Sequence, residues 1–347
     1  MAARPAPSDG KSNRERKKAS SVSKFTWKSS PVVKRYEGNP ILTARQIPFP
    51  SDMAYNAGVE KFRGRYVMMF RNIYWNHRYT KETQSLGLAY SDDGIHWEPQ
   101  KDFRFEPKGT VNPEDPRLIA VEGRMYVCFA DNTRQGLRGG IAVTDDFEEF
   151  ELLSLSAPDN RNMVLFPEKV NGKFARLERP FPVYGRREPE AFETWYSDSP
   201  DCRYWGNTQL VLKYDDVPFC NRKNGPAGQP IKTDRGWLTL FHAVHYDPDT
   251  VYPTWRNENW HKLYSVGIMM LDLKDPARIV GLSREPLMVP EAPYDYETDG
   301  YRSYTLFPCA TILEDDRTVR IYYGACDTVV CLATAKLDDL IALCKPV

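Results

Sequence analysis

Short runs of apolar and aromatic residues recur along the chain, many of them separated by only two to four residues. The first pair covers residues 57–62 and 64–70, where Gly64 and Arg65 precede an apolar run. Two such runs joined by so short a turn are typical of a β-hairpin. The pattern returns four more times, with first strands expected at 117–121, 164–170, 229–233 and 309–313 and second strands at 123–129, 172–177, 236–241 and 317–323.

A third strand follows each hairpin and, in the first three repeats, ends in a hydroxyl residue followed by Asp. Ser91, Thr144 and Ser197 occupy this position at equal intervals. The later units place a third strand at 268–272 and 332–337 after longer insertions, and a fourth strand follows the first unit at 97–99. Five units of about 50 residues, each with three or four antiparallel strands, predict an all-β, five-bladed β-propeller over residues 31–347. A two-sheet sandwich remains the structural alternative, because strand counts do not distinguish the two folds.

Other fold and motif classes find little support in the sequence. Strands and helices do not alternate as in βαβ units, and neither a dinucleotide-binding glycine motif nor a P-loop occurs. Residues 91–97 resemble the "Asp box" of carbohydrate enzymes, but the turn chemistry of Ser and Asp favours a structural turn on the outer side of a blade.

Composition narrows the function. The 347 residues carry 47 Lys+Arg and 47 Asp+Glu, and this zero net charge argues against nucleic acid as a partner. No apolar run approaches the roughly 18 residues of a membrane helix, so we expect no membrane association. The 27 prolines disfavour long helices, and the 13% aromatic content suits strands and carbohydrate-binding clefts.

The balanced charge is unevenly distributed. Residues 1–30 hold eight Lys/Arg against two acidic residues, so the remaining chain is acidic by the same margin. This Ser-rich segment lacks the apolar stretch of a secretory signal, and we expect a disordered N-terminal extension. A transit peptide or an arm that contacts another subunit of a homo-oligomer is the alternative.

The seven cysteines are dispersed and include no C-x-x-C pair, which disfavours a metal site. Their number and the absence of a signal peptide predict reduced, mostly buried thiols in a cytoplasmic protein.

Candidate chemistry lies where inner strands begin and second strands end, because these ends surround the funnel of a propeller. Asp115 lies between Pro113 and Pro116, and the following proline predicts extended geometry for it. A carboxylate on so stiff a segment suits a general acid. The alternative is that Asp115 only pairs with Arg117. Basic residues at the same ends of the repeat, which could instead be ordinary surface cations, are Arg161, Arg179 and Lys223.

Nucleophilic catalysis by serine or cysteine is not supported, because no nucleophile-elbow motif and no activated cysteine can be identified. His242 and His245 have no metal-site spacing, and we expect a structural or hydrogen-bonding role for His242.

Eight short motifs follow one another in a specific order after residue 35. They are Gly38-Asn39-Pro40-Ile41-Leu42, Tyr55-Asn56-Ala57-Gly58, Glu114-Asp115-Pro116-Arg117, Arg161-Asn162 with Val164-Leu165-Phe166-Pro167, Glu178-Arg179-Pro180, Tyr264-Ser265-Val266-Gly267, Leu306-Phe307-Pro308-Cys309, and Tyr322-Tyr323-Gly324-Ala325-Cys326-Asp327-Thr328. In this order they give a sequence that resembles the mannoside phosphorylases of glycoside hydrolase family 130, which are five-bladed propellers.

The resemblance implies that Asp115 is the general acid, with a proton route through a hydroxyl of the bound mannose. It implies no metal and no organic cofactor, because inorganic phosphate is itself a substrate. The implied phosphate-binding residues are Arg161, Arg179, Lys223 and Tyr264. The residues implied to bind the mannosyl unit and its neighbour are Asn56, Arg71, Asn162, His242, Tyr301 and Asp327. Two departures leave the acceptor sugar open, namely Ala57 in place of a serine found in some members, and residues 72–83, which match no known loop of the family.

Charge considerations agree with this reading. An inverting hydrolase needs a second carboxylate to activate water, whereas phosphate is already anionic and needs a cationic clamp. We therefore expect an inverting phosphorylase that converts a terminal β-mannosyl linkage and phosphate, reversibly, into α-mannose 1-phosphate and a shortened acceptor. The alternatives are a β-mannoside hydrolase on the same fold and a non-catalytic glycan-binding propeller.

Overall fold

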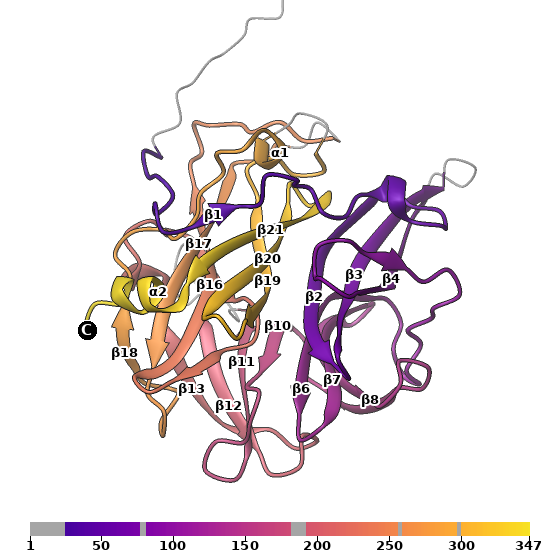
Figure 1. Ribbon diagram of the computed structural model, residues 1–347, viewed down its shortest axis with the longest axis horizontal. Helices are drawn as coiled ribbons and strands as arrows, with labels where there is room; N and C mark the ends of the chain where they lie inside the picture. The colour runs from indigo at the N-terminus through magenta and orange to yellow at the C-terminus, as the bar shows by residue number, and fades with distance from the viewer. Residues whose placement is uncertain (1–24, 77–80, 182–191, 256–258, 297–299) are drawn as a thin grey trace, which may run out of the picture.

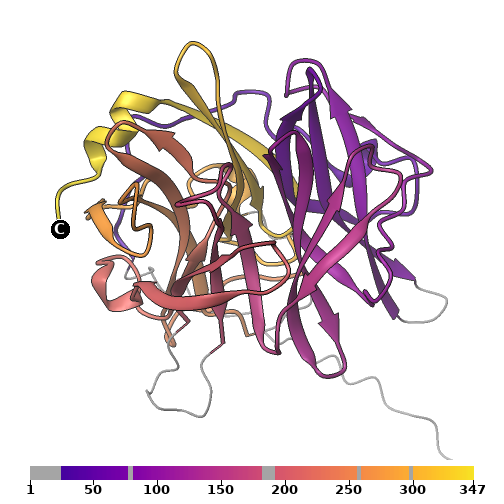
Figure 2. The ribbon, with the colours of Figure 1, turned by 90° about the horizontal axis from the view of Figure 1, so that it is seen from below.

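Five small antiparallel sheets surround a common axis in the computed structural model, which describes residues 25–76, 81–181, 192–255, 259–296 and 300–347 (Figures 1 and 2). The predicted five-bladed β-propeller is confirmed, and the sandwich alternative is wrong. Within each blade the strands follow chain order from the axis outward, except that the outermost strand of the last blade is β1. They are β2 (Met53–Phe62), β3 (Arg65–Asn76), β4 (Lys81–Ser91) and β5 (Glu98–Pro99) in blade 1; β6 (Pro113–Val121), β7 (Arg124–Thr133), β8 (Gly136–Thr144) and β9 (Glu151–Leu155) in blade 2; β10 (Asn160–Leu165), β11 (Phe174–Pro180), β12 (Thr194–Ser199) and β13 (Gly206–Leu212) in blade 3; β14 (Lys223–Pro226), β15 (Ile231–Thr233), β16 (Gly236–Tyr246), β17 (Lys262–Leu271) and β18 (Ile279–Leu282) in blade 4; and β19 (Leu306–Leu313), β20 (Thr318–Ala325) and β21 (Val329–Lys336) in blade 5.

The N-terminal segment closes the ring. Strand β1 (Lys34–Arg35) pairs with β21 and so supplies the outer strand of the last blade (Figure 1). The side chain of Asn39 reinforces this junction, because its amide exchanges hydrogen bonds of 2.8 Å with both backbone groups of Leu332. Closing a propeller with strands from both ends of the chain ties the first and last blades together.

Part of the predicted N-terminal extension packs on the propeller. Trp27 contacts the ring of Phe219, and Phe25 contacts His245 in blade 4. The backbone of Ser29 donates a hydrogen bond to the carboxylate of Glu291. Residues 1–24 lie outside the described residues, so the disorder expected for them stays a prediction.

Helical structure is limited to short segments: α1 (Pro293–Tyr296), α2 (Leu337–Leu343), and the 3₁₀ turns η1 (Ala44–Gln46) and η2 (Tyr214–Asp216). Helix α2 buries Leu337, Leu340 and Ile341 against blades 4 and 5. No helix in the described part of the chain has the length and apolarity needed to cross a membrane.

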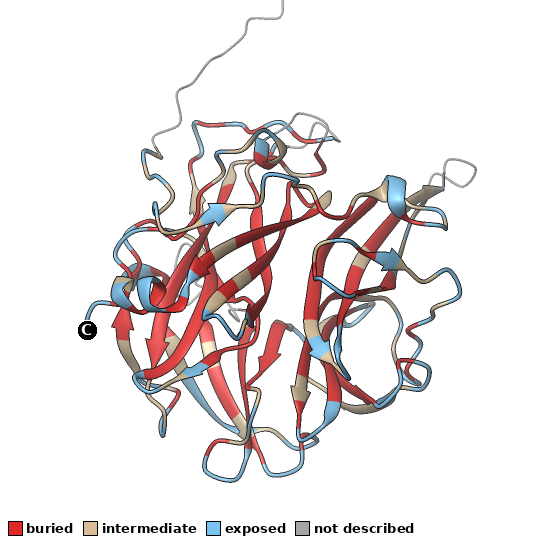
Figure 3. Ribbon diagram, in the orientation of Figure 1, coloured by how far each residue is buried: buried red, intermediate tan, exposed pale blue. Residues whose placement is uncertain are grey.

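A repeated side-chain pair fills the blades near the axis, where burial is most continuous (Figure 3). In blades 1, 2 and 4 a Phe on the second strand lies directly opposite a Gly on the third strand. A Cβ on any of these glycines would lie within 2.3 Å of the Phe ring, so the glycine makes room for the ring. The pairs are Phe70↔Gly87, Phe129↔Gly140 and Phe241↔Gly267.

The turns after the third strands follow the predicted turn chemistry. In the "Asp box" turn the Asp93 carboxylate accepts 2.8 Å hydrogen bonds from the backbone amides of Ile95 and His96. Asp146 and Asp201 form the same turn in blades 2 and 3. The third hydroxyl position is therefore Ser199 rather than the predicted Ser197, because β12 runs two residues further before it turns.

Inner strands begin several residues earlier than the apolar pattern predicted. Pro113 pairs with Asp131, and Asn160 pairs with Pro180, at the axial end of their blades. Polar residues and prolines do not resemble a strand in sequence, although a proline is compatible with the first position of one. Polar residues expected before the strands, such as Asn56, Asp115, Arg161 and Lys223, are therefore part of the strands, whereas Tyr301 and Arg302 precede β19 (Leu306–Leu313).

Blades 1 and 2 meet so closely that one position tolerates no side chain. A Cβ on Gly58 would lie 2.7 Å from the carbonyl oxygen of Pro116 and 2.8 Å from the Cα of Arg117. We expect Gly58→Ala to lower the free energy of unfolding by about 1–3 kcal/mol, because backbone atoms must move apart. Urea unfolding measures this. Gly206→Ala is the matched control, since a Cβ there meets no heavy atom within 4 Å; an equal loss in both variants would contradict the prediction.

Candidate active site

A cavity of about 250 Å³ lies at one end of the axis, and all five blades contribute to its lining. It brings together nine of the eleven predicted site residues, which are Asn56, Arg71, Asp115, Arg161, Asn162, Arg179, Lys223, Tyr264 and Asp327. Six cationic side chains line it, against the two carboxylates of Asp115 and Asp327. The excess of positive charge suits an anionic ligand.

A β-bulge in each of the first three inner strands aims a polar side chain into this cavity. Register shifts occur between Tyr55 and Gly58 in β2, between Glu114 and Arg117 in β6, and between Arg161 and Val164 in β10. Within these shifts the backbone adopts positive φ, with 49° at Asn56, 51° at Asp115 and 56° at Asn162. Asn and Asp tolerate this conformation better than other non-glycine residues, and bulges commonly redirect side chains next to active sites.

The predicted extended geometry of Asp115 is therefore wrong. The bulge overrides the preference that Pro116 imposes on the preceding residue, and Asp115 lies in the left-handed region. The segment is nevertheless fixed, because both flanking parts of β6 pair with β7.

Three side chains hold the carboxylate of Asp115. Arg161 Nη2 lies 2.5 Å from Oδ2, Asn56 Nδ2 donates to Oδ1 at 3.0 Å, and Arg71 Nη1 lies 3.5 Å from Oδ1. Pairing with Arg117, the alternative considered above, is wrong: its guanidinium binds the backbone carbonyls of Asp115, Pro116 and Ala227.

These contacts determine the charge state of Asp115 in the free site. Burial by itself raises the pKa of this carboxyl, but the cations of Arg71, Arg161 and Arg117 more than offset burial. They lower the pKa of Asp115 to about 2, so the unliganded site holds an ionised Asp115 at neutral pH.

Glu114 is a site residue that sequence reasoning did not single out. Its buried carboxylate bridges two arginines, with Oε2 at 2.9 Å from Arg71 Nη2 and Oε1 at 3.1 Å from Arg161 Nη2. Gln84 completes the arrangement by accepting a 2.7 Å hydrogen bond from Arg71 Nη2. The position of Glu114 beside Asp115 was a signal, but strand alternation would normally turn its side chain to the other face; the bulge allows both carboxylates to reach the arginines.

Arg179 and Lys223 form a cationic group beside Asp115 that has no carboxylate partner among the described residues. Burial and then the charge of Arg161 lower the pKa of Arg179 to about 9. The pKa of Lys223 is lowered well below its usual value by burial and then by Arg179, Lys262, Arg161 and Arg302. Its Nζ lies 5.2 Å from the ring centre of Tyr264, which completes this side of the cavity. Cations held together without a carboxylate partner among the described residues, in a poorly solvated site, favour an anionic ligand.

His242 and Tyr301 do not line the cavity. His242 is completely buried, and its Nε2 lies 3.0 Å from Nη1 of Arg179. Burial, followed by Arg179 and Lys223, lowers the pKa of His242 well below its usual value, so the neutral ring accepts this hydrogen bond and positions Arg179. Tyr301 packs beside the cavity against Trp255, with the guanidinium of Arg302 5.0 Å from its ring centre.

Several lining residues were not among the predicted site residues, and for Trp260 and Lys262 the reason is that the search covered only first and second strands. Lys262 lies two residues before Tyr264 on the third strand of blade 4, so alternation places both on one face. The remaining missed residues are Trp260, Arg302, Thr305 and Phe307.

Asp327 is the second carboxylate of the cavity. Burial raises its pKa, and the nearby charge of Asp115 adds to this effect against the opposing Arg302, whose Nη1 lies 3.4 Å away. The surroundings thus lower the pKa of Asp115 and raise the pKa of Asp327. In the part of the chain that the structure describes, no group of three or more His, Cys, Asp or Glu could hold a metal ion.

Comparisons with known proteins agree with the geometry. A family model described as β-1,4-mannooligosaccharide phosphorylase matches residues 27–346. The β-1,4-mannooligosaccharide phosphorylase of Ruminococcus albus is 30% identical, over 94% of this chain and 96% of the relative. The 1,2-β-oligomannan phosphorylase of Thermoanaerobacter sp. is 28% identical, over 89% and 98%. The solved structure of β-1,2-mannobiose phosphorylase from Listeria innocua, with β-1,2-mannobiose, shares the fold at a TM-score of 0.73, with 24% identity over 90% of this chain and 98% of that one.

Lys223 gives anion binding a pH dependence. Because its lowered pKa lets it lose its proton at a lower pH than usual, we expect sulfate affinity to fall as pH rises through that pKa. Lys223→Arg keeps the charge and should flatten this fall. Sulfate titration calorimetry between pH 6 and 8.5 measures it. The control is Lys232→Arg at an exposed ion pair with Glu168; an equally steep fall in Lys223→Arg would contradict the prediction.

Proposed function

The chain belongs to glycoside hydrolase family 130, the β-1,4-mannooligosaccharide phosphorylase family, and we propose on that premise that it is an inverting β-mannoside phosphorylase. It cleaves terminal β-mannosyl linkages of manno-oligosaccharides with phosphate, releases α-mannose 1-phosphate and a shortened acceptor, and is reversible. The observation that carries the proposal is the pair formed by the buried Arg179 and the half-buried Lys223, next to the ionised Asp115. This pair has no carboxylate partner among the described residues.

Phosphate binds between Arg161, Arg179, Lys223 and Tyr264, where guanidinium groups can hold its oxygens in a bidentate arrangement. Asn56, Arg71, Asn162 and Asp327 hold the mannosyl unit. His242 acts through Arg179, and Tyr301 supports the cavity from its side. The three cations and the tyrosine around phosphate offset the repulsion between phosphate and the Asp115 carboxylate. They also fix the direction in which phosphate approaches C1.

Asp115 donates the proton. The C1–oxygen bond to the acceptor breaks, a bond from C1 to a phosphate oxygen forms on the opposite face, and the leaving oxygen takes the proton of Asp115. The proton that the phosphate group loses on becoming the mannose 1-phosphate dianion restores Asp115, so charge and protons balance. No second carboxylate is needed to activate the nucleophile.

The low pKa of Asp115 in the free site fits a mechanism in which phosphate binds before Asp115 donates its proton. Arg161 binds Asp115 and also borders the phosphate group, so bound phosphate offsets the charge that keeps Asp115 ionised. Bound phosphate therefore raises the pKa of Asp115 and makes its acid form more accessible when the nucleophile is present. This coupling disfavours attack by water, which brings no negative charge.

We also propose a cytoplasmic location. All seven cysteines are free and buried, which suits a reducing compartment. The substrates, a sugar and phosphate, provide the chemistry without a metal or organic cofactor.

Product analysis tests the reaction. With β-1,2- or β-1,4-mannobiose, mannose 1-phosphate should form only when phosphate is added, and Asp115→Asn should reduce the rate about 10²–10⁴-fold. Chromatography and phosphorus NMR measure both. Free mannose at an equal rate without phosphate indicates a hydrolase, and binding without turnover indicates a glycan-binding protein; either outcome overturns the proposal.

Arg179 tests the phosphate site separately from the acid. Arg179→Met should raise the KM for phosphate at least tenfold, because a charge-assisted contact is lost, while the KM for the mannoside changes less. Arg203→Met serves as the matched control, since Arg203 forms an exposed ion pair with Glu151. If both KM values rise together in Arg179→Met, the residue does not act on phosphate specifically.

A further inference from the structure

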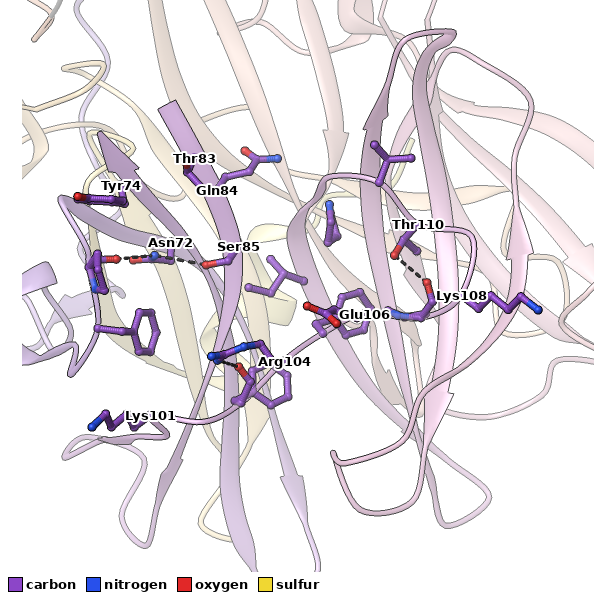
Figure 4. Close-up of a pocket in the computed structure, with 18 of the residues that line it drawn as sticks. Asn72, Tyr74, Thr83, Gln84, Ser85, Lys101, Arg104, Glu106, Lys108 and Thr110 are labelled. Atoms are coloured by element: carbon purple, nitrogen blue, oxygen red, sulfur yellow. Dashed lines mark hydrogen bonds between the residues drawn. The ribbon is translucent and has the colours of Figure 1, made fainter. Parts of the chain in front are cut away.

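A second cavity, of about 700 Å³, lies between blades 1 and 2 and is here termed the interblade cavity (Figure 4). One wall is formed by β3 and β4, which present Asn72, Tyr74 and Ser85. The other wall is the connection from blade 1 to blade 2, residues 101–113, which presents Thr110 and a charged rim. Neither wall belongs to the catalytic group described above.

Gln84 separates the interblade cavity from the axial cavity. It lines the interblade cavity, and its side-chain oxygen accepts the 2.7 Å hydrogen bond from Arg71 of the active site. Its amide nitrogen donates to the backbone carbonyl of Asn112 at 3.2 Å. One side chain thus forms the boundary between the two sites, and a chain leaving the active site past Arg71 meets the interblade cavity next.

The geometry of an inverting reaction also places the acceptor on the side of the interblade cavity. Inversion requires phosphate and the leaving group on opposite faces of C1. The phosphate-binding cations Arg161, Arg179 and Lys223 come from blades 3 and 4. In a ring of five blades, blade 1 lies opposite the junction of blades 3 and 4, and Asp115 of blade 2 protonates the leaving oxygen. The acceptor therefore extends toward blades 1 and 2.

The size of the axial cavity also indicates that the acceptor-side sugar units bind outside it. Its volume of about 250 Å³ is below the roughly 300–1,000 Å³ of pockets that enclose a whole small-molecule ligand. Phosphate and the terminal mannosyl unit must share it. The remaining units of a longer substrate need another binding surface.

The lining of the interblade cavity suits neutral sugar units. Aromatic rings of Tyr74 and Phe103 can pack on the apolar faces of sugars, while Ser85 and Thr110 offer hydroxyl groups for hydrogen bonds. Asn72 is 3% exposed, and its side-chain oxygen has no hydrogen-bond partner in the described structure. Of the four charged residues at the rim, Lys101, Arg104 and Lys108 are basic and Glu106 is acidic. All four are exposed to solvent, which weakens their attraction for an anion compared with that of the cations in the axial cavity.

We propose that the interblade cavity binds the acceptor-side units of manno-oligosaccharides of three or more units, and so determines the chain length that the enzyme prefers. This inference rests on the proposed phosphorylase function. It assigns Tyr74, Ser85 and Thr110 as specificity-determining residues, whereas Gln84 positions Arg71 at the boundary.

The test compares chain lengths in one linkage series, using the β-1,2 or β-1,4 mannosides that the wild-type enzyme cleaves. We expect Ser85→Trp, which fills the interblade cavity, to lower the ratio of kcat/KM for mannotetraose to that for mannobiose at least tenfold. Thr110→Trp fills it from the opposite wall and should act alike, which covers the case in which one variant fails to fold. Thr208→Trp on the exposed strand β13 is the matched control and should leave the ratio unchanged.

Each outcome is decisive. An unchanged ratio in both cavity variants, or an equal loss for both substrates, overturns the inference while leaving phosphorolysis intact. A wild-type enzyme that releases no mannose 1-phosphate from any mannoside instead overturns the proposed function itself. Thermal melting of each variant shows that the compared proteins are folded.

Discussion

The mutual repulsion of cations gathered at one end of the propeller axis is the constraint on which the site depends. Arg71 and Arg161 are balanced by Glu114 and Asp115, whereas Arg179 and Lys223 have no carboxylate partner among the described residues. Holding such charges in a poorly solvated cavity is costly, and the lowered pKa values of Arg179 and Lys223 express that cost. A bound anion would relieve this cost, which is why the cation cluster favours an anionic ligand.

Rigid surroundings keep these charges in place. The charges come from four blades. Arg161 and Arg179 lie opposite each other within blade 3, but the distances between charges of different blades depend on how the blades pack. The contact at Gly58 fixes blade 1 against the Asp115 segment, and β1 locks the first and last parts of the chain together. A closed propeller can therefore hold like charges close together at its axis, because the packed blades cannot easily move apart.

The same arrangement links binding to proton supply. In the proposed mechanism Arg161 is shared between Asp115 and the phosphate group, so the charge state of Asp115 depends on whether phosphate is bound. A hydrolase would need a base for water, whereas this cavity directs its positive charge at the nucleophile. Beyond Arg71 and Gln84 the walls of the interblade cavity add aromatic rings and hydroxyl groups to a charged rim.

The sequence by itself determined the five repeats, their hairpins, and which polar residues lie at the axial ends of the strands, because strand periodicity and turn residues are local properties. It also marked Asp115, Arg161, Arg179 and Lys223 through their shared place in the repeat and their motifs. Only the tertiary structure decided the positive φ of Asp115, the bridge that Glu114 makes between two arginines, the burial of His242 beneath Arg179, and the part that β17 plays through Lys262. These features depend on bulges and on contacts between blades that are distant in sequence. Local patterns gave only partial signals, namely the position of Glu114 beside Asp115 and the alternation that places Lys262 with Tyr264. The charge that Asp115 experiences comes largely from arginines on other strands and blades.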